Sequence, residues 1–330
     1  MKRFIILALA LSLLLCGCES TRLTRQVYLM DTIINITLNP DAVEENLDEI
    51  ENILESVENL ASPTKADSSV SVLNSGGKAT DELVELITYA DELSGYTNGA
   101  FDISLGKLIS LWDIKSETPR VPEEDEIQNA KLTCGMDKIR VTENSVALEN
   151  GIEINLGAIA KGYAGDKVYT YLKENSISGI ASIGGSVVAH GLRPDDNPWS
   201  VGIRSPYGTS AEYMGVLEMT DSIIAVSGDY ERFFEKDGIR YHHILDPKTG
   251  YPAKSDIKSV AVVSKNGAYA DALSTALFVM GKEKAIELWK EKNDFEFIII
   301  DSNRTVTVSQ GLSNSFTLTD GGYNLETQDR

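Results

Sequence analysis

Hydrophobic residues recur along this chain with two different spacings, and each spacing predicts one kind of element. Residues 41–60 carry Leu47, Ile50, Leu54 and Val57 three or four positions apart, with acidic residues between them. This spacing is typical of an amphipathic helix with a solvated acidic face. Thr80, followed by an acidic turn, predicts a second helix over residues 80–96. Further helices are expected over residues 158–174, 268–279 and 282–290, and a loop with a short helix over residues 119–130.

Short β-branched or alternating runs predict strands, and most of them lie in the second half of the chain. One strand is expected over residues 22–38, and three short runs over residues 138–156 predict a meander. Residues 62–74 are polar and predict turns, while the residues after Gly321 predict a frayed tail. Other strands are expected over residues 179–183, 187–190, 199–203, 214–219, 223–227, 240–245, 259–263, 295–300 and 305–308. With no internal repeat and no long linker, the pattern favours one compact α+β unit, within which subdomains remain open.

The segment at residues 99–104 begins where the second helix is expected to stop. Gly95 and Asn98 mark that stop, and Phe101 and Trp112 follow it. On the local pattern, these two aromatic residues belong to the core of a strand that the helix end leads into.

The first residues predict a processed leader. Lys2 and Arg3 precede an apolar run over residues 4–15, which is too short to cross a bilayer core of about 30 Å as a helix. The run and the Leu-x-Gly-Cys that follows resemble a bacterial lipoprotein signal. We therefore expect residues 1–17 to be removed, Cys18 to carry lipid and residues 18–26 to form a tether to the extracytoplasmic, periplasmic face of a membrane. An ordinary secretory signal is the alternative.

The charge of the chain restricts what it can bind. The formal net charge is −20 at pH 7, from 50 acidic and 30 basic residues, and no cluster of Lys and Arg is present to hold a phosphate backbone. A nucleic-acid surface is therefore excluded, and an anionic ligand needs a local cation. Lys161 supplies one, because it opens a predicted helix after the small residues 157–160, where the main chain can approach a ligand. Neither a G-x-G-x-x-G nor a P-loop motif is present, and an ordinary surface lysine is the alternative.

Asp271 and Thr275 are candidates for a metal site. They are four residues apart on a predicted helix, so that the carboxylate and the hydroxyl lie on one face. Both are hard oxygen donors, which suits Mg²⁺. The alternative is a helix-opening Asp271 next to the break at Asn266 and a Thr275 that bonds to its own helix.

His242 and His243 are adjacent, so in a strand they point to opposite faces and cannot share one site. This weakens a zinc interpretation, which no H-x-x-x-H or C-x-x-C motif supports. A single histidine facing a cleft fits a general acid or base near neutral pH. The turn signal over residues 246–250 would hold it in place.

Several segments, taken in order, resemble those of one family. They are Met30-Asp31-Thr32, Gly99-Ala100-Phe101-Asp102, Asn155-Leu156-Gly157-Ala158-Ile159-Ala160-Lys161-Gly162-Tyr163, Ser227-Gly228-Asp229-Tyr230-Glu231, His243-Ile244-Leu245-Asp246-Pro247-Lys248-Thr249-Gly250 and Ala270-Asp271-Ala272-Leu273-Ser274-Thr275-Ala276-Leu277. Together they resemble the ApbE family, the lipoprotein flavin transferases, over residues 28–318.

The resemblance implies a fold and an activity. The expected fold is a single compact α+β domain over residues 27–320, related to the T-fold, with mixed and antiparallel sheets flanked by helices and a tail at 321–330. The expected reaction uses Mg²⁺, takes FAD as substrate, transfers the FMN moiety to a Ser or Thr hydroxyl of an acceptor protein and releases AMP. The expected acceptors are extracytoplasmic flavoprotein subunits, such as those of Rnf-type and sodium-pumping NADH:quinone reductase complexes.

The resemblance also implies roles for single residues. His243 matches the histidine for which a catalytic acid/base role is proposed. The metal positions of the family are matched by Asp271, Ser274, Thr275 and the main-chain carbonyl of Ala158. The positions that contact FAD are matched by Met30, Ala100, Phe101, Asp102, Asn155, Lys161 and Leu245. The sequence departs from the family at Thr64, where many relatives carry an aromatic residue, and at Asp31, where glycine is usual.

Two other functions stay open at this point. If water replaced the acceptor hydroxyl, the protein would be a Mg²⁺-dependent FAD pyrophosphatase that yields FMN and AMP. A non-catalytic flavin-binding lipoprotein is an alternative of another class. Asp271, Thr275, Lys161 and His243 argue against such a carrier, because a carrier needs neither an acid nor a base.

Overall fold

The structure, a computed structural model, describes residues 22–149, 151–209 and 212–330. The predicted leader at residues 1–17 and the predicted lipidation site at Cys18 lie outside the described residues. The helices are α2 Glu44–Ala61, α3 Ser69–Asn74, α4 Asp81–Tyr96, α5 Gly106–Trp112, α6 Glu124–Lys131, α7 Ala160–Glu174, α8 Gly267–Met280 and α9 Lys282–Lys292. The strands are β1 Leu23–Leu29, β2 Thr32–Leu38, β3 Ile139–Thr142, β4 Ser145–Leu148, β5 Gly179–Ile183, β6 Ser186–His190, β7 Trp199–Arg204, β8 Tyr213–Met219, β9 Ser222–Gly228, β10 Phe233–Lys236, β11 Ile239–His242, β12 Ile257–Ser264, β13 Glu296–Asp301, β14 Thr305–Ser309, β15 Phe316–Leu318 and β16 Asn324–Gln328.

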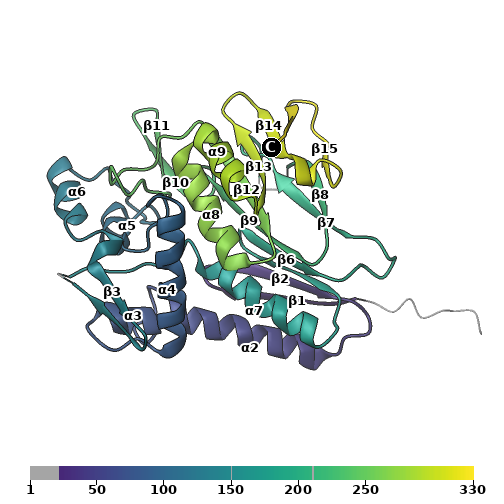
Figure 1. Ribbon diagram of the computed structural model, residues 1–330, viewed down its shortest axis with the longest axis horizontal. Helices are drawn as coiled ribbons and strands as arrows, with labels where there is room; N and C mark the ends of the chain where they lie inside the picture. Colours follow the sequence, from purple (N-terminus) through teal and green to yellow (C-terminus); the bar gives the residue numbers. More distant parts are fainter. Residues whose placement is uncertain (1–21, 150, 210–211) are drawn as a thin grey trace, which may run out of the picture.

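A large central sheet carries the fold. Its strand order is β1-β2-β5-β6-β9-β12-β13-β14-β16, antiparallel throughout except for the parallel pair β14 and β16. Helices α2, α7 and α8 pack on one face of this sheet (Figure 1). The smaller sheet β15-β8-β7 packs on the other face. The prediction of a compact α+β domain with mixed and antiparallel sheets flanked by helices is confirmed.

Strand β9 lies in the middle of the central sheet and has buried side chains on both faces of it. Ile223 and Ala225 pack on the helical side, while Ile224 between them packs towards the smaller sheet, and all three are fully buried. Alternate residues of a strand point to opposite faces, so a central strand covered on both sides reads as a continuous hydrophobic run. The strand therefore holds α7 and α8 firmly on one side of the sheet.

The long helices begin where local side chains can accept main-chain N–H groups. Thr80 Oγ1 accepts from the N–H of Leu83 at 3.3 Å at the start of α4, as predicted. Asn266 Oδ1 accepts from the N–H of Tyr269 at 2.8 Å at the start of α8. These bonds satisfy donors that have no partner within the first turn of a helix.

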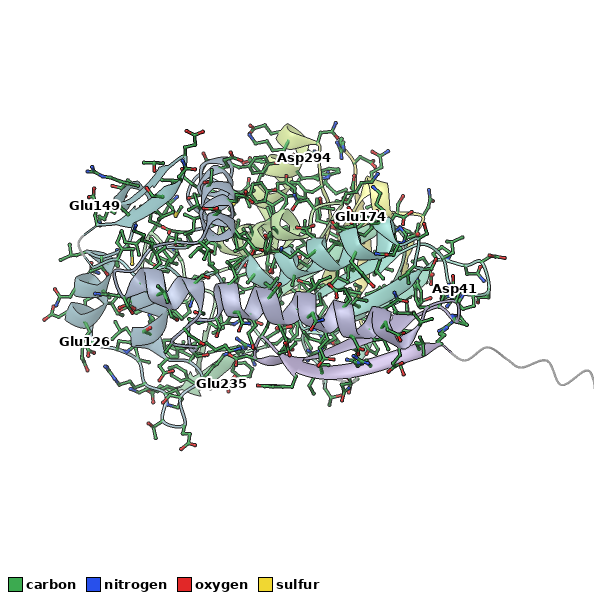
Figure 2. The ribbon with its side chains drawn as sticks, turned by 90° about the horizontal axis from the view of Figure 1, so that it is seen from below. Asp41, Glu126, Glu149, Glu174, Glu235 and Asp294 are labelled. Atoms are coloured by element: carbon green, nitrogen blue, oxygen red, sulfur yellow. The ribbon has the colours of Figure 1, made fainter. Side chains whose placement is uncertain are left out.

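Acidic side chains are spread over the outside of the molecule (Figure 2). Asp41, Glu126, Glu149, Glu174, Glu235 and Asp294 are found on different sides of it. These six acidic side chains therefore do not gather in one patch. Within the described part of the chain, every helix is too short or too polar to cross a membrane.

The first predicted strand is a hairpin instead. Strands β1 and β2 pair around Met30 and Asp31, whose φ angles are 54° and 57°. Two successive residues in the left-handed region are what a tight two-residue turn between antiparallel strands requires. The prediction of one strand over residues 22–38 is therefore wrong, because no glycine or asparagine marks the turn.

Four other local predictions need correction. The segment predicted as turns contains α3, and the segment after Gly99 leads into α5 instead of a strand. Phe101 and Trp112 are nevertheless core residues, each 1% exposed, as expected. In the predicted meander, β3 and β4 pair, whereas the third run makes an isolated bridge from Glu153 to Leu105. The frayed tail is also wrong, because β16 pairs with β14.

The region around the paired histidines differs too. The strand predicted over residues 240–245 ends at His242, and β10 precedes it as an unpredicted partner. Asp237 and Gly238 connect the two strands, with φ angles of 53° and 75°. An Asp-Gly pair between two β-prone runs is a strong hairpin signal, so the sequence does contain the information for this hairpin.

Candidate active site

His242 is bound into the core at the end of β11. Its ring is 6% exposed, and Nε2 lies 3.0 Å from the carbonyl oxygen of Ala253. A carbonyl only accepts, so Nε2–H is the donor, and Nδ1 accepts the N–H of Ile244 at 3.3 Å. Burial lowers the pKa of His242. Both ring nitrogens are thus used within the fold, and His242 is a structural residue.

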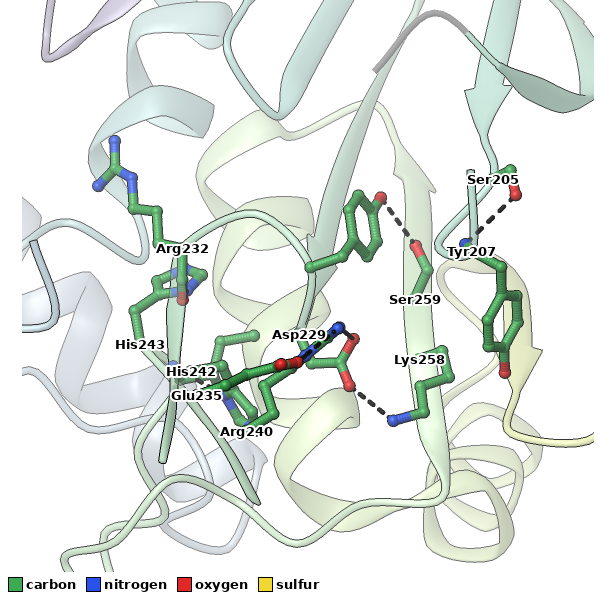
Figure 3. Close-up of polar contacts among 12 residues, drawn as sticks. Ser205, Tyr207, Asp229, Arg232, Glu235, Arg240, His242, His243, Lys258 and Ser259 are labelled. Carbon is green, nitrogen blue, oxygen red and sulfur yellow. Dashed lines mark hydrogen bonds and ion pairs between the residues drawn. The ribbon is translucent and has the colours of Figure 1, made fainter. Parts of the chain in front are cut away.

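His243 points the other way, towards Arg232 (Figure 3). Its Nδ1 lies 3.3 Å from the carbonyl oxygen of Arg232, so Nδ1–H donates there and Nε2 keeps its lone pair. Burial, with the charges of Lys161 and Arg232 nearby, lowers the pKa of His243 to about 3. The ring is therefore neutral near pH 7, and its Nε2 atom is available as a base.

Asp271 lies at the start of α7, although it belongs to α8. Its carboxylate is 5% exposed and accepts the N–H of Gly162 at 2.9 Å. Burial raises the pKa of Asp271, while the Lys161 ammonium and the main-chain N–H groups of Gly162 and Lys161 act in the opposite direction. An ionised carboxylate at such depth is stable only next to positive charge. Lys161 supplies one such charge, and a bound cation fits the same place.

The other expected metal donors come from α8 and from the residues just before α7. Thr275 follows Asp271 by one turn of α8, and Ala158 lies in the turn just before α7, whose Gly162 N–H is accepted by Asp271. Ser274 is fully buried and donates its hydroxyl to the main-chain oxygen of Asp271 at 2.9 Å, with Ser227 Oγ at 2.8 Å.

These groups make the site suitable for Mg²⁺. A carboxylate, a threonine hydroxyl and a main-chain carbonyl are hard oxygen donors, few enough to leave room for water and phosphate oxygens. Among the described residues, no group of three or more His, Cys, Asp and Glu side chains comes together as a metal cluster. The donor set therefore fits Mg²⁺ better than a metal that needs several nitrogen or sulfur ligands.

The β1–β2 turn closes one side of the site. Asp31 Oδ2 bonds to Lys115 Nζ at 2.7 Å, and Arg232 approaches the carbonyl of Asp31 at 3.5 Å. The Lys115 bond lowers the pKa of Asp31. The Met30 N–H donates to Glu58 at 2.8 Å, which fixes the turn on α2. Asp31 thus takes a positive φ of 57° and is held there by its ion pair with Lys115.

Gly184 brings the β2 end of this turn next to α7. It lies in the turn between β5 and β6 with a φ of 63°, and a Cβ atom there would be 3.0 Å from Thr32 Oγ1 and 3.3 Å from Lys161 Cδ. The Met30–Thr32 segment and Lys161 are therefore neighbours, although far apart in sequence.

The remaining expected flavin contacts offer mostly main-chain atoms. Phe101 and Leu245 are 1% and 5% exposed, so their side chains belong to the core. Asn155 Oδ1 accepts the N–H of Gly157 at 2.9 Å and shapes the approach to α7. Asp102 accepts the N–H of Ser104 at 2.7 Å, and burial raises its pKa. Ala100 is almost buried, at 9% exposed.

Two functional candidates escaped the sequence analysis. Arg232 adds a cation next to His243, and only its position in the turn before β10 reveals this. Asp229, 5% exposed, binds Lys258 Nζ at 2.7 Å and lies 3.6 Å from Arg240, which ties the β10–β11 hairpin to β12 (Figure 3). The sequence signal for Asp229 is its place directly after a predicted strand, within the Ser227–Glu231 motif.

The convergence of these segments matches a known family. A model described as ApbE family matches residues 30–299. The chain belongs to the ApbE family. An FAD:protein FMN transferase of Treponema pallidum (strain Nichols) is 33% identical over 309 residues, which cover 86% of this chain and 84% of that relative. An ApbE relative with the same name from Vibrio cholerae serotype O1 is 31% identical, over 89% of this chain and 92% of its own.

Solved ApbE structures show the same architecture. The ApbE protein from Thermotoga maritima superimposes with a TM-score of 0.82 at 30% identity, over 89% of this chain and 99% of that one. The flavin transferase ApbE from Vibrio cholerae gives a TM-score of 0.77 at 28% identity, over 91% and 96% of the two chains. The predicted family membership is thus confirmed.

Proposed function

We propose that this chain is an FAD:protein FMN transferase, which moves the FMN moiety of FAD to a Ser or Thr hydroxyl of an acceptor flavoprotein. The observation that carries the proposal is the state of His243. Its Nδ1–H is held by the Arg232 carbonyl, its ring is neutral, and Nε2 is a free base close to Lys161. A bound pyrophosphate is anionic, and an anion near the ring raises the pKa of His243 towards the range in which it can take the proton of a hydroxyl nucleophile.

The chemistry follows from these groups. The acceptor hydroxyl oxygen attacks the phosphorus of the FMN half, its proton passes to His243 Nε2, and the bridging bond to AMP breaks. Lys161, which acts on both His243 and Asp271, would balance the pyrophosphate charge, and Arg232 would add a second cation. Bound Mg²⁺ would neutralise charge on the phosphate oxygens, held by Asp271, Thr275 and the Ala158 carbonyl, with Ser274 supporting the helix.

The flavin and its contacts are part of the same proposal. Main-chain atoms of the segments around Met30 and Ala100, together with Asn155, would contact FAD. The acceptors would be extracytoplasmic flavoprotein subunits of Rnf-type or sodium-pumping NADH:quinone reductase complexes. A lipid on Cys18 would hold the enzyme at the membrane on that side, where these acceptors are found.

The experiment incubates the purified protein with FAD and Mg²⁺, with and without an acceptor domain, and follows AMP release and the mass of the acceptor. A mass gain of one FMN that requires both acceptor and metal is expected. AMP and free FMN without acceptor would make the protein a pyrophosphatase. Unchanged bound FAD would leave only a flavin-binding lipoprotein.

Replacing Asp271 tests the metal site within this proposal. Asp271→Ala should lower the rate on the order of 10³-fold, because a phosphate-bound metal supplies several kcal/mol. Circular dichroism should show a folded protein. Asp41→Ala, an exposed aspartate before α2, is the matched control and should retain the wild-type rate. An unchanged rate in Asp271→Ala would remove this carboxylate from the reaction.

A further inference from the structure

Helices α7 and α8 touch at their first turns, through a glycine on each. A Cβ atom on Gly162 would overlap the carbonyl oxygen of Gly267, and a Cβ atom on Gly267 would overlap the carbonyl oxygen of Gly162. Each of these two positions therefore excludes every residue except glycine. In Figure 1, α7 and α8 approach each other on the helical face of the central sheet.

At this crossing, each helix caps the other. Asp271 of α8 accepts the N–H of Gly162 in α7 at 2.9 Å. Asp166 of α7 accepts the N–H groups of Gly267 and Ala268 in α8, at 2.5 Å and 2.8 Å. Each aspartate comes four residues after the contact glycine of its own helix, so the two segments share the pattern G-x-x-x-D. The arrangement is reciprocal, with one aspartate on each side.

We propose that Asp166 is a positioning residue that sets where Asp271 stands in the site. The inference rests on the proposed role of Asp271 as a metal ligand. The first N–H groups of a helix have no partner inside it, so whatever accepts them fixes the helix start. Asp271 lies four residues after Gly267, about 6 Å along the axis. A shift of the α8 start therefore displaces the Asp271 carboxylate directly.

The energetics argue against a purely stabilising role for Asp166. Burial, helped by the like charge of Asp271, raises the pKa of Asp166 to about 6, against the pull of its two N–H bonds. Keeping this carboxylate ionised at pH 7 thus costs folding free energy. The α8 start already has a local cap, since Asn266 accepts from Tyr269. What Asp166 adds is a link from α8 to α7.

The side chain at position 166 also has room to change. A cavity of about 220 Å³ lies beside it, lined by Tyr89, Tyr163, Asn266 and others. A smaller or neutral side chain there meets no overpacking, and water can enter. Variants at this position therefore test the bonds to α8 with little added strain.

The test measures Mn²⁺ binding to the full chain without FAD, from the loss of the free Mn²⁺ signal in electron paramagnetic resonance. Mn²⁺ is the probe because it accepts the same oxygen donors as Mg²⁺. Asp166→Ala should raise the Kd about tenfold or more, as loss of a group that orients a ligand does. Asp166→Asn keeps one acceptor oxygen and should fall between wild type and Asp166→Ala.

Asn266→Ala is the matched control, because it removes a cap from the same helix without cutting the link to α7. It should lower the Tm and leave the Kd near that of wild type. In flavin transfer, Asp166→Asn should need more Mg²⁺ for half-maximal rate, with kcat recovered at saturation.

These measurements distinguish the positioning role of Asp166 from the metal site at Asp271. A folded Asp166→Ala or Asp166→Asn that binds Mn²⁺ like wild type overturns the positioning role. An equal rise of the Kd in Asn266→Ala also overturns it, because general fraying of the α8 start would then explain the weaker Mn²⁺ binding. Wild type that fails to bind Mn²⁺ would instead overturn the proposed metal site at Asp271, and this inference with it. If Asp166→Ala does not fold, the Kd of Asp166→Asn for Mn²⁺ is the test of the positioning role.

Discussion

His242 and His243 are neighbours in the chain, yet His242 is a structural residue and His243 is the proposed base. Both rings have a lowered pKa, and burial is the largest cause in each. His242 uses both nitrogens inside the fold, on Ala253 and Ile244. His243 uses one nitrogen on the Arg232 carbonyl and leaves the other for a substrate.

Burial alone therefore does not identify a catalytic histidine. What distinguishes His243 is one free nitrogen next to cations from other segments, Lys161 and Arg232. The alternation of side chains along β11 and the residue after it separates the two rings. The same backbone therefore supplies a structural residue and a base.

Removing the ring of His243 should give the largest effect in this pair. His243→Ala should lower kcat for flavin transfer about 10²- to 10⁴-fold, the usual contribution of a general base. Stability should change little, because His243 gives the fold one long hydrogen bond. Single-turnover transfer to an acceptor domain and a thermal melt measure the two quantities. Wild-type kcat in a folded His243→Ala would exclude the ring as the base.

Removing the ring of His242 should do the reverse. His242→Ala leaves the Ala253 carbonyl and the Ile244 N–H without partners and opens a cavity against Phe278, at a cost of about 2–4 kcal/mol. Urea unfolding measures this loss. The rate per folded molecule, taken at low temperature, should stay close to wild type. A large loss of kcat with an unchanged urea midpoint would mean that both histidines act in the reaction.

The sequence predicts the frame of this site well, because its helices have strong periodicity and clear caps. Thr80 and the spacing of Leu47, Ile50 and Leu54 place α4 and α2 within a few residues. The opposite faces of the two histidines also follow from strand geometry alone. The ordered motifs predicted the family, which the family model confirms.

Other features depend on contacts that no local pattern encodes. The turn at Met30 and Asp31 has no glycine, and it is held by Lys115 and Glu58 from distant segments. Strand β16 is polar and becomes a strand only because β14 offers an edge. Asp166 looks like a surface residue of an amphipathic helix until α8 is placed across it. Long-range packing decides each of these.

The smallest expected effect concerns Arg232, which lowers the pKa of His243 in addition to burial and Lys161. The folded pKa of His243, about 3, is below the usual value near 6.5, so the base stays unprotonated as pH falls through the neutral range. Arg232→Ala removes one of the cations that lower this pKa but keeps the main-chain carbonyl that holds Nδ1. The acid limb of kcat/KM, which reports the free enzyme, should therefore move upwards by about one pH unit.

Profiles of kcat/KM against pH for wild type and Arg232→Ala check this shift. Asp166, whose pKa burial raises to about 6, can add a limb of its own. That limb would stay in place in Arg232→Ala, because the arginine is not among the groups that set the Asp166 pKa. Arg232 also lowers the pKa of Asp31, so a limb that moves belongs to His243 only if it moves equally in the Asp31→Asn background. Superimposable profiles would mean that Arg232 does not tune the base, and that burial and Lys161 suffice to separate His243 from His242.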